Sequence, residues 1–235
     1  MLPEFDINRI VVMVTPLLFA VSLHEAAHGY AALKMGDDTA ARAGRITLNP
    51  IRHVDPVGSV VLPLLLAVFN APFVFGYARP VPVNPALFRN WKKGTLWVSS
   101  AGVLANLVFM MMAGVCFRIL LIAAQAALPM SPLALFLVTD LLLMLGYFVL
   151  INAVLAVFNL IPIPPLDGSN ILLVFLPPAM RKRFASMGRF GIILLLFLLT
   201  IKADWFFNAI WFVIMPLVHL ALGSGGLNFI AGSSP

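Results

Sequence analysis

The sequence predicts an all-α protein that crosses a membrane several times. Of its 235 residues, 62% are hydrophobic and only 10% are charged, and the mean hydropathy is +1.03. Soluble globular domains do not have this composition. The apolar residues also gather in runs long enough to cross a bilayer as helices, separated by polar stretches rich in proline, glycine and arginine. We therefore expect about five full transmembrane helices in a single domain, residues 1–222.

The first predicted helix spans residues 8–33 and stays in the mature protein, because its start lacks the basic flank of a signal peptide. The next polar stretch contains an apolar-polar alternation at 45–48, which predicts a short β element. Residues 57–75 are apolar again, but two prolines and an asparagine interrupt them. We expect that segment to be re-entrant or to lie at the membrane interface.

Four further runs predict full crossings, at 95–127, 132–160, 190–201 and 205–222. The proline-rich stretch 161–168 must break the helix before it, because proline lacks a backbone donor and clashes with the preceding turn. The glycine- and serine-rich residues 223–235 predict a flexible C-terminal tail. Cys116 is the only cysteine, so neither an internal disulfide nor a thiolate metal site is expected.

The first run ends in the motif His24-Glu25-Ala26-Ala27-His28. On a helix, residues four apart share one face, so both imidazoles point to one place and Glu25 lies beside them. Two metal ligands and a general base need this arrangement. The alternative is that both histidines are ordinary core residues and that the glutamate extends its carboxylate to the water at the membrane surface. Three ionisable groups within five residues of a membrane span favour a site instead.

Asp167 is the best candidate for a third protein ligand, which a catalytic zinc site usually requires. It follows the forced helix break, and a broken helix at membrane depth is tolerated only inside protein or beside a wet cavity. The alternative is that Asp167 caps a short helix that begins near Ser169.

These motifs resemble the site-2 protease family of intramembrane zinc metalloproteases, in its compact subgroup without PDZ or CBS domains. The resemblance rests on the histidine motif, on Gly102-x-x-x-Asn106, and on the stretch from Asn159 to Gly168. It implies that His24, His28 and Asp167 bind one catalytic Zn²⁺ and that Glu25 activates water. Val103 departs from the family pattern, which usually has proline there.

Asn159 and Asn106 are candidate donors to the oxyanion of a peptide-hydrolysis intermediate, because a side-chain amide can donate without carrying charge. Hydrogen bonding between helices is the alternative for both residues. For His53 and Asp55, local hydrogen bonds in a proline-rich loop are favoured over a role as further ligands.

The shared ligand set also predicts the topology. The end of the first helix and the end of helix 132–160 must lie on the same side of the membrane, which is met if 57–75 does not cross. This arrangement puts twelve of the 15 Lys and Arg residues on one side. By the positive-inside rule, that side is cytoplasmic. We expect a multi-pass cell-membrane protein with its N-terminus outside, its C-terminus inside and zinc toward the cytoplasm.

The function that follows is zinc-dependent hydrolysis of peptide bonds in or near transmembrane helices. The expected partners are membrane-helix protein substrates and the lipid bilayer, and assembly into a homo-oligomer is left open. The net charge of +6 indicates loops that face anionic headgroups, so no nucleic-acid partner is expected. The alternative function is a non-catalytic membrane protein that binds zinc or a helix, or a metal transporter. The sequence shows no internal repeat of the kind many transporters have.

Overall fold

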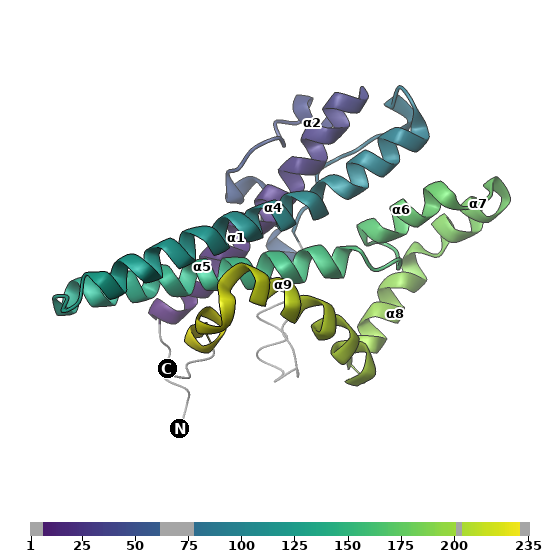
Figure 1. Ribbon diagram of the computed structural model, residues 1–235. Helices are drawn as coiled ribbons and strands as arrows, with labels where there is room; N and C mark the ends of the chain where they lie inside the picture. The colour runs from purple at the N-terminus through teal and green to yellow at the C-terminus, as the bar shows by residue number, and fades with distance from the viewer. Residues whose placement is uncertain (1–6, 62–77, 201–203, 231–235) are drawn as a thin grey trace.

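A computed structural model describes residues 7–61, 78–200 and 204–230 (Figure 1). Throughout these ranges the regular structure is helical, and no strand is present. Four of the described helices are long and apolar enough to cross a membrane: α1 (Ile7–Met35), α4 (Trp91–Ala126), α5 (Pro132–Asn159) and α9 (Asp204–Ile230). The predicted class, an all-α polytopic membrane protein, is confirmed.

Shorter helices connect and flank these four. The predicted crossing at 190–201 coincides with α8 (Gly188–Thr200), whose 13 residues reach about 20 Å, less than a bilayer core. Its continuation at 201–203 lies outside the described residues, so this crossing stays a prediction. The remaining elements are α2 (Thr39–Arg42), η1 (Pro50–Arg52), η2 (Pro56–Val61), η3 (Pro85–Leu87), α6 (Asp167–Phe175) and α7 (Pro178–Ser186).

The long helices pack as a bundle in which α4 and α5 form an antiparallel pair (Figure 1). Ser131 starts α5 by accepting a hydrogen bond from the Ala134 amide. Helix α1 lies against both members of the pair, and α9 also contacts both. Phe117, Val149 and Val218, from α4, α5 and α9, are fully or almost fully buried in the main apolar core. This core fixes α4 and α5, against which α1 presents its histidines.

The proline-rich break after α5 is formed as predicted. Helix α5 ends at Asn159, and the chain reverses before α6 begins at Asp167. A Cβ at Gly168 would lie 2.2 Å from the Leu160 carbonyl oxygen, so only glycine permits this reversal. The break therefore turns the Asp167 side chain back toward the bundle.

Two sequence predictions are corrected. Residues 45–48 are not a strand, because no partner strand lies within the described ranges. The Thr47 carbonyl oxygen contacts Nε2 of His53 instead of the backbone amide of a neighbouring strand. The predicted flexible tail is helical as far as Ile230, because α9 resumes after a turn at Gly223 and Phe229 packs against Phe117. The predicted re-entrant segment 57–75 lies largely outside the described residues.

Asp37 ties the end of α1 to the segment that precedes α4. It is fully buried, and it accepts hydrogen bonds from the hydroxyl and amide of Thr39 and, at 2.6 Å, from the amide of Asn84. Burial by itself would raise the pKa of Asp37. The hydrogen bonds from Thr39 and Asn84 outweigh it and hold the pKa below its usual value.

We predict that Asp37→Asn lowers the stability of the protein at pH 7 by about 1–3 kcal/mol, because an amide NH₂ would face backbone donors. Since the native pKa of Asp37 lies below its unfolded value of 3.8, the ionised carboxylate stabilises the fold above that pH. The benefit is lost as the pH falls through the native pKa. The measurement is thermal unfolding in detergent from pH 7 to pH 3, where the difference from wild type should shrink on acidification.

Asp38→Asn is the matched control, because the pair of Asp38 with Arg42 is exposed and contributes little. A difference between wild type and Asp37→Asn that does not change with pH contradicts the assignment.

Candidate metal centre

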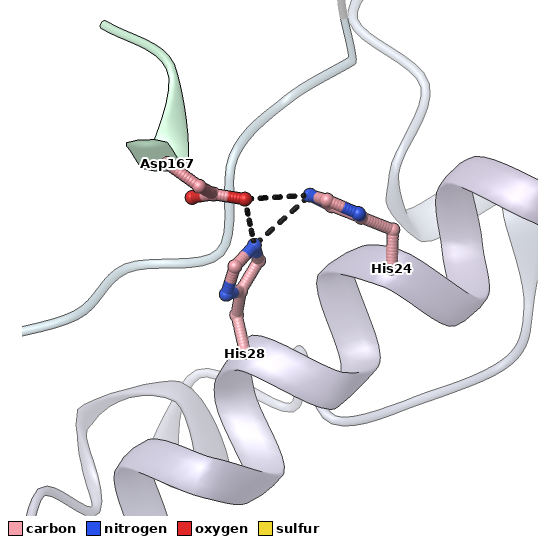
Figure 2. Close-up of side chains that lie close together, drawn as sticks. All are labelled: His24, His28 and Asp167. Atoms are coloured by element: carbon pink, nitrogen blue, oxygen red, sulfur yellow. Dashed lines mark hydrogen bonds and ion pairs between the residues drawn. The ribbon is translucent and has the colours of Figure 1, made fainter. Parts of the chain in front are cut away.

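Helix α1 and the start of α6 bring three potential ligands together (Figure 2). His24 and His28 lie one turn apart on the same face of α1, and Asp167 approaches them from the break after α5. The two Nε2 atoms are 3.0 Å apart, and Asp167 Oδ2 lies 3.2 Å from Nε2 of His24 and 3.1 Å from Nε2 of His28. The three atoms form a nearly equilateral triangle.

Hydrogen bonds on the far side of each ring fix the tautomers. Nδ1 of His24 contacts Asn106 Oδ1 at 2.6 Å, and Nδ1 of His28 contacts the Val98 carbonyl oxygen at 2.7 Å. Both partners are acceptors, so each Nδ1 carries the proton and donates it. Each ring therefore turns its Nε2, the nitrogen that a metal ion would bind, toward Asp167.

The triangle fits a bound cation. Asp167 Oδ2 is buried and has no hydrogen-bond partner among the described residues. Ligand atoms at zinc distances of about 2.0–2.2 Å in a tetrahedron lie roughly 3.3–3.6 Å apart, a few tenths of an ångström more than the spacings of 3.0–3.2 Å seen here. Two imidazoles and one carboxylate are also a donor set that zinc accepts. Asp167 does not cap α6, since Leu166 is its N-cap residue and no side-chain cap bond forms.

Gly102 makes room for the two imidazoles on α4. A Cβ at this position would lie 2.5 Å from His24 Cε1 and 2.5 Å from His28 Nε2. Helix α4 therefore reaches α1 closely enough to support the histidines only with glycine here. Val103, where the family usually has proline, leaves α4 uninterrupted.

A buried chain of amides orients His24. Asn106 is 0% exposed, and its Nδ2 donates to the Ala20 carbonyl oxygen at 3.3 Å and to Asn152 Oδ1 at 2.7 Å. Asn152 in turn donates to the Phe148 carbonyl oxygen. Because Asn106 commits its amide hydrogens to these acceptors, it has none to offer an oxyanion. The structure favours a role in positioning His24, in place of the expected role toward substrate.

Glu25 lies at the edge of a cavity of about 360 Å³ that the three potential ligands also line. Its Oε2 accepts a hydrogen bond from the Val81 amide at 2.7 Å. Asn159 lines the same cavity, although its Nδ2 also donates to the Leu155 carbonyl oxygen. The expectation that Asn159 contacts substrate stays a prediction.

His53 and Asp55 are not part of the three-residue ligand group. His53 is buried with Nε2 2.9 Å from the Thr47 carbonyl oxygen. Asp55 accepts hydrogen bonds from the amides of Val57 and Gly58. Both make the local loop contacts that turn chemistry favoured.

Four contributors to the site were not predicted from the sequence: Gly102 as the space for the imidazoles, Asn152, the Val98 carbonyl and the Val81 amide. The G-x-x-x-N spacing places Gly102 and Asn106 on one face of α4, and this was a usable signal. Asn152, an amide inside an apolar span, was another. The backbone groups of Val98 and Val81 leave no mark in the sequence.

Fold and site together define a multi-pass membrane protein with a buried His-His-Asp centre, and the comparisons with known proteins agree. Residues 134–199 match the family model described as Peptidase family M50. The "Putative zinc metalloprotease YwhC" of Bacillus subtilis is 39% identical over 186 residues, which cover 79% of this chain and 78% of that protein. The "Putative zinc metalloprotease Rip2" of Mycobacterium tuberculosis is 28% identical over 205 residues, covering 86% and 73%. No solved structure matches significantly.

The chain belongs to peptidase family M50, the site-2 protease family. It is a membrane protein of the metalloprotease class, as the resemblance implied. The names of both relatives include zinc, and the donor set at His24, His28 and Asp167 is compatible with that metal.

We predict that Gly102→Ala abolishes stoichiometric zinc binding, because its methyl group would displace both imidazoles. The measurement is the zinc content of the purified protein by atomic emission, after dialysis against a buffer that contains trace zinc. Gly225→Ala is the control, since a Cβ there meets nothing within 4 Å. Retention of one zinc per chain by Gly102→Ala contradicts this account of the glycine.

We predict that Asn106→Ala weakens zinc binding by about 10–100-fold, the usual effect of removing the partner that orients a metal-binding histidine. The measurement is competition for zinc with a chromogenic chelator, at a pH where wild type is fully loaded. The exposed Asn208→Ala in α9 should bind as wild type does. An unchanged affinity in Asn106→Ala shows that the amide chain does not support His24.

Proposed function

We propose that this protein is a zinc-dependent endopeptidase that hydrolyses peptide bonds in or near transmembrane helices. One observation carries the proposal: the converging atoms of His24, His28 and Asp167 line the same cavity as the carboxylate of Glu25, between helices of membrane-spanning length. A structural metal site would have no use for a carboxylate beside it that does not bind the metal.

Each residue then has a distinct task. His24, His28 and Asp167 would hold Zn²⁺, which when bound supplies an acidified water and a positive charge beside the scissile carbonyl. Glu25 takes a proton from water and later delivers it to the leaving amine. The Val81 amide holds one oxygen of the Glu25 carboxylate and so fixes its direction. Asn159, on the cavity wall, is the candidate donor to the developing oxyanion.

The substrate must present an unwound stretch of backbone, because the carbonyls of an intact helix are hydrogen-bonded and shielded by side chains. Pro80, Val81 and Val83 supply part of the cavity wall from a segment that is neither helix nor strand. A cavity of about 360 Å³ holds a few residues and not a whole helix. We therefore infer that substrates are membrane proteins whose helices unwind locally beside this segment.

The orientation in the cell membrane follows from the charges. If the N-terminus lies outside and 57–75 does not cross, twelve of the 15 basic residues and the zinc site lie toward the cytoplasm. Labelling of the arginine and lysine side chains with a membrane-impermeant reagent, on intact cells and on inverted vesicles, would show from which side each is accessible and so test this placement.

We predict that Glu25→Gln keeps about one zinc per chain and lowers kcat by about 10²–10⁴-fold, because glutamine cannot accept a proton from water. The measurement is cleavage of a panel of single-span substrates in liposomes by protein of known zinc content. Asp38→Asn, which also removes one carboxylate, should cleave as wild type does.

The outcomes separate the two functions that the sequence left open. Cleavage by wild type and none by metal-loaded Glu25→Gln supports the protease. Zinc in both proteins and cleavage by neither favours a binding or transport function. Equal cleavage by wild type and Glu25→Gln contradicts the role of Glu25.

A further inference from the structure

A second cavity, of about 380 Å³, is lined by arginines and lies beside residues 79–82, the segment whose Val81 amide binds Glu25. Its charged lining consists of Arg45, Arg52 and Arg79, and proline and apolar side chains make up most of the rest. Within the part of the chain that the structure describes, no Asp or Glu lines it. Three positive charges thus face one space without a carboxylate among them.

Arg45 is the buried member of this group. Only 8% of its surface is exposed, and its Nη2 donates to the Arg79 carbonyl oxygen at 2.6 Å and, more weakly, to that of Pro80 at 3.4 Å. Its Nε is buried and has no hydrogen-bond partner. Among the described residues, Arg45 forms no salt bridge. A buried guanidinium is costly unless an anion and further acceptors compensate it.

We propose that this cavity binds a phosphate group, either as free phosphate or as part of an anionic lipid headgroup. Guanidinium groups match phosphate oxygens with paired hydrogen bonds, and arginine is the preferred residue for this recognition. Arg45 supplies a buried guanidinium that has no anionic partner among the described residues, while the exposed Arg52 and Arg79 admit the ion from outside. One phosphate would neutralise charges that otherwise repel one another.

The position of the cavity links this anion to the other site. Pro80 lines both cavities, and Arg45 holds the carbonyl groups of residues 79 and 80. The next residue, Val81, donates its amide to Glu25. An anion bound to Arg45 would therefore brace the segment that orients Glu25. The anion site itself does not depend on the proposed protease activity.

The test measures binding by purified full-length protein in detergent, through the shift of the thermal unfolding midpoint at constant ionic strength. The probes are inorganic phosphate, dihexanoyl phosphatidic acid and dihexanoyl phosphatidylcholine. Arg52→Gln is the primary variant because Arg45 also holds the backbone, so that Arg45→Gln could unfold the loop. Arg89→Gln is the matched control, an exposed arginine that lines neither cavity.

Wild type should bind phosphate or phosphatidic acid saturably, Arg52→Gln should bind about 10-fold more weakly, and Arg89→Gln should bind within twofold of wild type. Saturation by inorganic phosphate supports a free phosphate ligand, and saturation by phosphatidic acid alone supports a lipid headgroup. Equal binding of phosphatidylcholine, equal weakening in Arg89→Gln, or no saturable binding overturns the proposal. None of these readouts requires zinc or cleavage, so failure here is distinct from failure of the proposed function.

Discussion

The structure depends on keeping three electron-rich atoms close together inside a helical bundle. The Nε2 atoms of His24 and His28 and Oδ2 of Asp167 lie within 3.2 Å of one another, the spacing that a shared cation needs. A rigid surround is required to hold three such atoms together. That surround comes from three helices: α1 carries the rings, α4 approaches them at Gly102, and α6, which follows the break after α5, begins at Asp167.

Hydrogen bonding also decides which nitrogen of each imidazole points toward the potential metal site. The Val98 carbonyl and Asn106 Oδ1 take the Nδ1 protons, so both Nε2 lone pairs point the same way. Asn106 is itself oriented by Asn152, whose amide is oriented by the Phe148 carbonyl. The site is thus specified by the packing of α4 on α5 as well as by the motif on α1. Asn106 and Asn152, two polar residues within apolar spans, have this purpose here.

Much of this could be read from the sequence because its signals are local. Helical runs of apolar residues, proline at the break and two histidines four apart act through short-range geometry, and these gave the long helices and the candidate ligands. The sequence left the role of Asn106 open because a buried amide reads the same whether it faces a substrate or a neighbouring helix. The strand at 45–48 and the tail after Gly223 failed for a related reason. Both depend on which distant segment supplies a partner.

The support for the ligands and the support for Glu25 are of different kinds. The two histidines lie on α1, which packs against α4 and α5, and Asp167 starts α6, which packs against α4. The carboxylate of Glu25 is instead held by a backbone amide from a segment without regular structure. That segment is anchored by Asp37 through Asn84 and by Arg45 through the carbonyls of residues 79 and 80. Asp37 and Arg45 therefore help to hold the Val81 amide in place. The contacts that position the carboxylate of Glu25 are thus separate from the contacts that position the two histidines.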